Sequence, residues 1–139
     1  MAKGKEIKRL RYQKTKRIVV KEEPTKVNYD NQKPIFAFYY MQYGGDHCLS
    51  RCGQQEKATV TDKLIELSQI TWKQIINSPK TGSGFEKIPR KQFKVPLPSI
   101  ATPEVTIKVF RHSHMGRIAG FRKNDIYHIL LIGDNLYNH

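Results

Sequence analysis

Hydrophobic and polar positions alternate in the last quarter of the chain, and this pattern predicts a small β-sheet. Residues 105–110 alternate apolar and polar side chains, and residues 117–122 form a second short candidate strand. Residues 126–132 alternate only in part, because several side chains on the second face are apolar as well. Alternation with a period of two is typical of a strand with one buried face. The turn at residues 123–125 is short enough for a tight hairpin. We therefore expect three C-terminal strands.

Earlier in the chain the apolar positions predict one more strand and a helical region. Residues 35–43 are rich in aromatic side chains and carry no charge, which favours a buried strand. Within residues 56–77, Val60, Leu64 and Leu67 are spaced four and three apart, as on one face of a helix. Thr59 with Asp62 is a candidate N-cap, and Ser68 is a second one. The region therefore forms one or two helices.

The order of these elements predicts the fold class. Residues 80–104 are rich in Gly and Pro and indicate a loop with short strands at 85–88 and 92–95. A strand, one or two helices, an irregular connection and then three strands is the order of an α+β fold. We expect one or two helices packed on one face of an antiparallel sheet.

Charge divides the 139 residues into a basic N-terminal arm and one domain. Residues 1–33 contain 11 Lys and Arg residues against 4 acids, and residues 34–139 form the single expected domain. An arm of this kind usually follows phosphates without reading sequence, and a solvated tail is the alternative. The apolar residues 18–20 favour a short strand at residues 17–21. The arm's candidate nucleic-acid ligands are Lys8, Arg9, Arg11, Lys14, Lys16 and Arg17.

The net charge of +13 favours a polyanionic partner, and nucleic acid is the commonest one. A basic protein with no such partner is the alternative, and an anionic membrane surface lacks a supporting amphipathic helix. No apolar run approaches the ~18 residues of a membrane span, and the N-terminus is charged from Lys3 onward. We expect a cytoplasmic protein that does not contact a membrane.

Arg, His and Tyr residues interleaved with the C-terminal strands are candidates for phosphodiester chemistry. RNA cleavage by transesterification needs a base, a cation beside the phosphate and an acid for the leaving oxygen. Arg117 and Arg122 are five apart, so both face one site only if a bulge intervenes. His128 alternates with apolar residues and is as readily a core histidine as a site residue. We expect cations from Arg111, Arg117, Arg122 and Lys123, acid or base groups from His112, His114 and His139, with the first two exposed, and a proton donor or stacking ring from Tyr137.

Two other constellations have simpler interpretations. His47, Cys48 and Cys52 with His112 and His114 could hold zinc, with Asp46 as a substitute ligand, but a Cys pair in such a chain is more often two small buried thiols. We expect no metal and no cofactor. Within the aromatic segment at residues 35–43, Tyr39 and Tyr43 are the candidates for stacking on nucleic-acid bases.

The C-terminal residues resemble those of the RelE/ParE superfamily of toxins. The resemblance rests on residues 109–111, residues 116–118, the apolar strand ending in Gly133, and Leu136 with Tyr137. It covers about 35 residues well and the helical region in outline. The chain has Asp134 and Asn135 where many members have His and Arg.

The resemblance implies a RelE-like fold and a metal-independent endoribonuclease that cleaves mRNA, often on the ribosome, and is neutralised by an antitoxin protein. By position, Arg111 and Arg117 would bind phosphate and Tyr137 would take the C-terminal aromatic role. Two alternatives remain: a nucleic-acid-binding protein of bacterial or phage origin without catalysis, and a scaffold or interaction protein.

Overall fold

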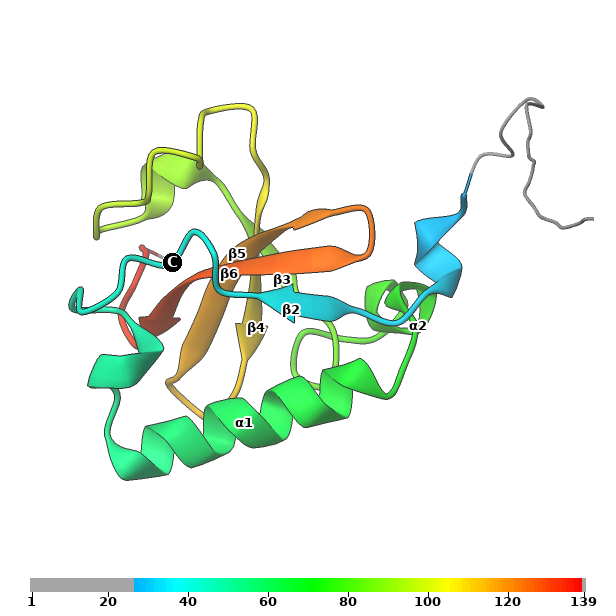
Figure 1. The fold of residues 1–139 in the computed structure, drawn as a ribbon, viewed down its shortest axis with the longest axis horizontal. Coiled ribbons are helices and arrows are strands. Elements are labelled where there is room, and N and C mark those ends of the chain that lie inside the picture. The colour runs from blue at the N-terminus through cyan, green and yellow to red at the C-terminus, as the bar shows by residue number, and fades with distance from the viewer. Residues whose placement is uncertain (1–26, 139) are drawn as a thin grey trace, which may run out of the picture.

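A five-stranded sheet lies at the centre of residues 27–138, the part of the chain that the computed structural model describes (Figure 1). In chain order the strands are β2 (Ile35–Ala37), β3 (Glu86–Ile88), β4 (Ile107–Arg111), β5 (Arg117–Lys123) and β6 (Ile126–Gly133), and in space they are arranged β2-β6-β5-β4-β3. The strands from β3 to β6 pair antiparallel, whereas β2 pairs parallel with β6. The α+β class is confirmed. The sheet is mixed because no hairpin links β2 to β6, so their relative direction is not constrained by a turn.

The helical region contains two helices, α1 (Gln54–Ser68) and α2 (Trp72–Ile76). The break after Ser68 agrees with the sequence pattern, but the cap of α2 is Thr71, which forms a capping box with Gln74. The cap expected at Thr59 was wrong, because α1 already begins after Gly53. Three short 3₁₀ turns complete the helical elements of the described residues: η2 (Tyr29–Asn31), η3 (Leu49–Arg51) and η4 (Arg90–Gln92).

Two expected strands differ in the structure. The first is β2, which ends at Ala37 instead of residue 43, and its Ile35 is 55% exposed because β2 is an edge strand. The expected strand at residues 92–95 is replaced by η4 and a single bridge between Phe93 and Tyr137. Prolines 89 and 96 flank this segment, and proline cannot donate to a strand ladder.

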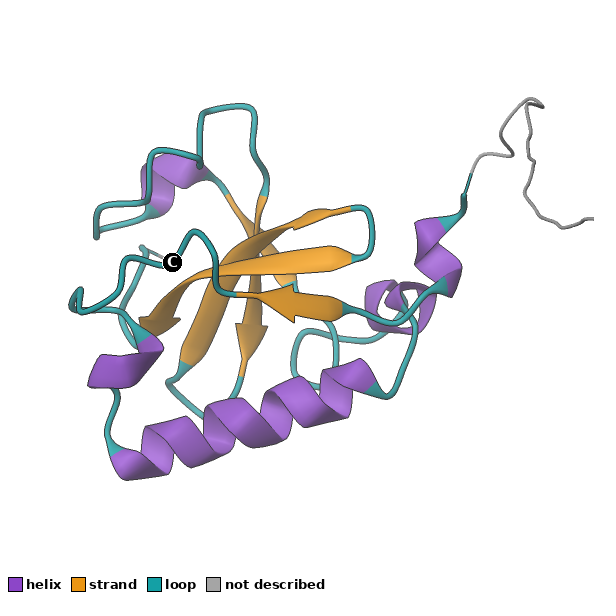
Figure 2. Cartoon of the chain, in the orientation of Figure 1, coloured by secondary structure: helices purple, strands orange, loops and turns teal. Residues whose placement is uncertain are grey.

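Two hydrophobic clusters lie on opposite faces of the sheet. We call the face covered by α1 and α2 the helix face; Figure 2 shows α1 running along this side. Its buried cluster consists of Val60, Leu67, Trp72, Ile75, Phe110, Ile118, Tyr127, Ile129 and Ile132. The other side is covered by the connection between β3 and β4, and we call it the loop face. Its buried cluster consists of Ile88, Ala101, Ile107, Val109, Ala119, Phe121, Leu130, Leu131, Leu136 and Tyr137.

A β-bulge adjusts the register where β5 meets β6. Ala119 pairs with Leu131 and Gly120 pairs with Ile129, so Leu130 is the extra residue. The bulge is on β6 and leaves β5 regular. Arg117 and Arg122 therefore lie on opposite faces of the sheet. This is the arrangement that their spacing of five residues predicts for a strand without a bulge.

Residues 1–26 and His139 lie outside the described residues. The strand expected at residues 17–21 falls there, as do all six candidate ligands of the arm: Lys8, Arg9, Arg11, Lys14, Lys16 and Arg17. The end of the expected arm, at residues 27–33, contacts the domain, because Asp30 pairs with Arg122 and the Trp72 backbone amide donates to the Gln32 carbonyl. Within residues 27–138, no helix has the length and apolar character needed to cross a membrane.

Candidate functional site

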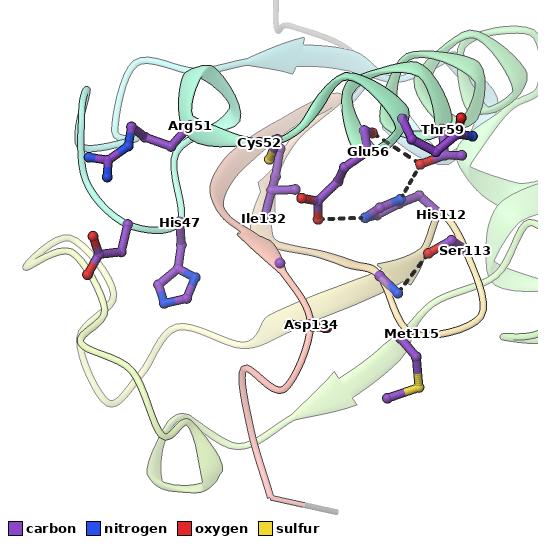
Figure 3. A pocket seen from close by; sticks show the side chains of 14 residues that line it. His47, Arg51, Cys52, Glu56, Thr59, His112, Ser113, Met115, Ile132 and Asp134 are labelled. Atoms are coloured by element: carbon purple, nitrogen blue, oxygen red, sulfur yellow. Dashed lines mark hydrogen bonds and ion pairs between the residues drawn. The ribbon is translucent and has the colours of Figure 1, made fainter.

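The site is centred on His112, the residue that follows β4. Its position continues the alternation that turns Phe110 toward the helix face, so the imidazole lies beneath the first half of α1. The His112 side chain is 1% exposed, and its Nδ1 is 2.9 Å from the hydroxyl oxygen of Thr59. Its Nε2 is 3.7 Å from a carboxylate oxygen of Glu56. Figure 3 shows Glu56 and Thr59 reaching from α1 toward the ring. The expectation that His112 is exposed was wrong, because α1 covers it.

A tight turn between β4 and β5 positions the imidazole. The His112 amide donates to the Gly116 carbonyl at 3.1 Å, and the Gly116 amide donates to the Ser113 hydroxyl at 2.8 Å. The ring lies directly against Gly116. An added Cβ on Gly116 would be 2.3 Å from Cε1 and 2.4 Å from Nε2 of His112, closer than side-chain contacts permit. Only glycine therefore leaves room for the ring in this position.

The hydrogen bonds of Thr59 indicate which nitrogen of His112 carries the proton. The Thr59 hydroxyl donates to the backbone carbonyl of Glu56 at 3.1 Å, so its single proton is already used. The hydroxyl oxygen then accepts a hydrogen bond from Nδ1 of His112. The neutral imidazole accordingly holds its lone pair on Nε2, which faces the Glu56 carboxylate.

The surroundings keep His112 neutral at physiological pH. Burial lowers the pKa of His112 below its usual value, and the charges of Arg117 and Lys63 lower it further, while the Glu56 carboxylate opposes them. A neutral imidazole with a lone pair beside a carboxylate can accept a proton. The pair of Glu56 and His112 is therefore a candidate general base.

Two hollows open on either side of His112 and share Thr59, His112 and Ser113 as lining residues. The first has a volume of about 550 Å³ and lies between η3, α1 and the end of β6; it is also lined by Asp46, His47, Arg51, Cys52, Glu56 and Asp134. The second, of about 410 Å³, lies toward the loop before β3. It is also lined by Asp62, Lys63, Glu66, Thr81, Arg111 and His114.

Two other predicted site residues line the second hollow with His112. His114 is exposed in the turn, as expected, and Arg111 is partly buried. The Nε atom of Arg111 is buried and has no hydrogen-bond partner among the described residues. Lys63 is already engaged, because its ammonium donates to the Gly82 carbonyl and pairs with Glu66. Arg111 and His114 are therefore the groups of this hollow best suited to bind a phosphate.

Arg117 supports the turn instead of lining a hollow. Its guanidinium is 9% exposed and donates to the backbone carbonyls of Ser113, His114 and Gly116 at 3.0 to 3.3 Å. It was expected to contact phosphate or take part in catalysis. In the structure it lies behind the turn that carries His114, and its hydrogen bonds to the turn carbonyls stabilise the conformation of that turn.

The other predicted residues lie away from His112. Arg122 stacks on Trp72 at 4.4 Å and pairs with Asp30 at 2.8 Å, on the helix face near α2. Lys123 is exposed at the β5–β6 turn. Tyr137 is 2% exposed and packs against Phe93 in the loop-face cluster, so it does not share a surface with His112. His128 is stacked on Phe121 at 4.8 Å, as a partly buried histidine among aromatic rings.

Sequence reasoning missed Glu56 and Thr59. They are three residues apart on α1 and lie on one side of it, a spacing visible in the sequence. The spacing alone does not indicate a site, because polar residues on an amphipathic helix usually face solvent.

Cys52 lines the first hollow, whereas Cys48 lines the apolar hollow between the segment after β2 and α1. Cys48 is buried and Cys52 is half-buried, and both are free thiols. Burial raises the pKa of the Cys52 thiol to about 12, and Glu56 contributes to this rise. Cys52 is therefore a neutral thiol at physiological pH. Within residues 27–138, no group of three or more His, Cys, Asp or Glu side chains is arranged to hold a metal ion.

Comparisons of the chain with protein-family models, curated proteins and solved structures found no match. The site must be interpreted from its own geometry and charge.

Proposed function

We propose that the protein binds RNA and cleaves it at the His112 site by metal-independent transesterification. The observation that carries this proposal is the neutral imidazole of His112, oriented by Thr59 and paired with the Glu56 carboxylate at the edge of a hollow. The net charge of +13 supports a polyanionic substrate. A cytoplasmic location and a neutralising partner protein belong to the same proposal.

In the proposed reaction, the 2′-oxygen of a ribose attacks the adjacent phosphorus, and its proton passes to the Glu56 carboxylate, which lies 3.7 Å from Nε2 of His112. The Glu56 side chain is 32% exposed, so it meets the ribose, while His112 stands behind it with a free lone pair. The phosphodiester spans the two hollows across His112, Thr59 and Ser113, the residues that both hollows share. From the second hollow, Arg111 stabilises the charge on the phosphorane, and the His114 side chain donates a proton to the departing 5′-oxygen. The P–O5′ bond breaks, and the products are a 2′,3′-cyclic phosphate and a 5′-hydroxyl.

The test is cleavage of single-stranded RNA by purified protein in the presence of EDTA. Glu56→Gln keeps the size of the side chain but removes the base, and we expect cleavage to fall about 100-fold or more. His114→Ala should reduce cleavage about 10-fold or more, since it removes the acid. The matched control is Glu104→Gln, an exposed carboxylate in the β3–β4 connection. Cleavage of the 2′-deoxy oligonucleotide should be absent for every variant.

Equal cleavage by the wild type and Glu56→Gln would contradict the proposal, as would cleavage of the 2′-deoxy substrate. In a bacterium, induced wild-type protein should arrest growth with fragmented mRNA, and the Glu56→Gln/His114→Ala double variant should not. Normal growth and intact mRNA with soluble wild-type protein would exclude a toxin.

A second candidate is nucleic-acid binding without catalysis. It is favoured by Lys87, Arg90 and Lys91, exposed basic residues that line a hollow of about 470 Å³ at β3 and η4, where they are not associated with His112. Triple substitution of these residues to Ala should weaken RNA affinity and lower its salt dependence. Strong binding with no cleavage under any condition would favour this candidate. Absence of RNA and DNA binding at low salt would leave a scaffold role.

A further inference from the structure

An apolar hollow of about 470 Å³ lies on the other side of η3 from the His112 site. Its lining combines aromatic and aliphatic side chains from the segment after β2 with two residues of α1: Phe38, Met41, Tyr43, Cys48, Leu49, Ser50, Lys57 and Thr61. Tyr43 is 88% exposed and Phe38 is 42% exposed. Exposed rings that gather at an apolar hollow form a contiguous apolar surface, which is typical of a ligand or partner site.

Backbone and side-chain contacts hold this segment in place. The Met41 amide donates to the Phe38 carbonyl, and the Leu49 amide contacts the Met41 sulfur at 3.4 Å. The Arg51 guanidinium donates to the Gly44 carbonyl at 2.9 Å, which fixes the chain just after Tyr43. The aromatic rings therefore stand on an ordered turn, so little backbone conformational entropy is lost when a ligand binds to them.

The chemistry of the lining matches an unstacked nucleobase. A base has two flat π-faces, which stack on aromatic rings, and a polar edge, which forms hydrogen bonds. Tyr43 and Phe38 supply the rings, and Ser50 and Thr61 add hydroxyl oxygens to the lining. Lys57, which also lines the hollow, complements the negative charge of the attached phosphate.

The apolar hollow is continuous with the His112 site along the chain. Ser50 lines the apolar hollow, and the next two residues, Arg51 and Cys52, line the first hollow beside His112. On α1, Lys57 faces the apolar hollow and Glu56 faces His112. A strand of RNA that crosses η3 and the start of α1 would therefore place a base in one hollow and a neighbouring phosphodiester in the other.

We infer that this apolar hollow binds one unpaired base of single-stranded RNA, stacked on Tyr43, next to the phosphodiester held at His112. This inference rests on the proposed function for its RNA ligand, but it does not depend on cleavage. It restricts the substrate to single-stranded RNA, since the bases of a duplex are already stacked and cannot enter the hollow.

The test measures binding of a fluorescein-labelled, 2′-O-methyl single-stranded octanucleotide of uridine by anisotropy, which removes cleavage from the experiment. Tyr43→Ala should weaken binding about 5- to 100-fold, and Tyr43→Phe should bind within about twofold of the wild type because the ring remains. The matched control is Tyr39→Ala, since Tyr39 is 84% exposed but does not line the hollow. Affinity for a 2′-O-methyl duplex of equal length should be unchanged by Tyr43→Ala.

Three results would overturn the inference. Equal effects of Tyr43→Ala and Tyr39→Ala would show that the hollow is not used. Equal weakening toward single strand and duplex would place Tyr43 against the backbone and not a base. A wild-type dimer in sedimentation that Tyr43→Ala dissociates, with unchanged RNA affinity, would assign the hollow to a second copy of the chain. If the wild-type protein does not cleave RNA but Tyr43→Ala still weakens binding, only the proposed function is contradicted. If the wild-type protein binds no RNA, both the proposed function and this inference are contradicted.

Discussion

The two faces of the sheet contain the same types of side chain and use them in different ways. On the helix face the apolar cluster stops at His112, where Thr59 and Glu56 of α1 give the imidazole polar partners beside two hollows. On the loop face the cluster closes over Tyr137, and His128 stacks on the ring of Phe121. The two buried rings therefore differ in their partners: His112 has polar neighbours at the end of its cluster, whereas Tyr137 is enclosed within an apolar one.

The largest expected effect is on the loop face, where Tyr137 should behave as a core residue. Tyr137→Ala should lower the free energy of unfolding by about 3–5 kcal/mol, because a buried aromatic ring is lost and a cavity is left. Tyr39→Ala, a substitution of an exposed tyrosine, should change it by less than about 0.5 kcal/mol. Urea denaturation measures both. If Tyr137→Ala unfolds like the wild type but loses RNA cleavage, Tyr137 belongs to the site and the contrast between the faces fails.

The next effect separates the two arginines that face each other across β4 and β5, Arg111 and Arg117. Arg117→Met should lower the free energy of unfolding by about 2–3 kcal/mol, because three turn carbonyls lose a charged donor. Arg111→Met should cost less than about 1 kcal/mol. It should instead weaken binding of a non-cleavable RNA, measured by anisotropy. The reverse assignment, with stability lost at Arg111 and RNA binding lost at Arg117, would show that the sequence-based interpretation of Arg117 was right.

Gly116 offers a way to disturb the helix-face site without changing any of its polar groups. Gly116→Ala should displace the His112 ring and cost about 1–3 kcal/mol, as overpacking usually does. Cleavage should fall with it, because the imidazole no longer faces Glu56. Gly53→Ala is the matched control, since an added Cβ there has no atom within 4 Å. The chemical shifts of the His112 ring, followed by NMR, should move only in Gly116→Ala.

The smallest effect concerns pH and links the two histidines. Burial lowers the pKa of both His112 and His128 in the folded protein. The contribution of these two histidines to the free energy of unfolding should therefore be fully present above the histidine pKa of the unfolded chain, about 6.5. It should be lost as the pH falls through the lower pKa values of the folded protein, because the unfolded chain takes up protons first. His128→Phe should keep the ring contacts and make this decline shallower. A decline of the same depth in His128→Phe would leave His112 as the source.

Much of the fold follows from alternation within short segments. Residues 107–111, 117–123 and 126–133 lie close to the expected strands, because each strand's burial can be read from its own sequence. The helical break near Ser68 was also visible. The short η4 segment could not be predicted from alternation. It depends on the flanking prolines and on the bridge between Phe93 and Tyr137, which is a contact distant in sequence.

The candidate site was harder to predict because its parts are far apart in sequence. Arg, His and Tyr were grouped by proximity along the C-terminal strands, but alternate residues of a strand point to opposite faces. Arg117 is held by the carbonyls of the β4–β5 turn, and Tyr137 is packed in the loop-face cluster. Glu56 and Thr59 come from α1, more than fifty residues before His112. No local sequence pattern predicts that these two residues contact the His112 ring.

The parallel pairing of β2 with β6 has a consequence for the order of assembly during synthesis. Ile35 lies beside Ile126, so β2 leaves the ribosome about 90 residues before its partner exists. The three C-terminal strands are neighbours in sequence and form quickly, whereas a contact of this range pays a large loop-closure entropy first. The first hollow also needs Ile132, Gly133 and Asp134. A nascent chain that stops before β6 therefore has neither the completed sheet nor a closed site, and any activity of this site begins only after β6 has been made.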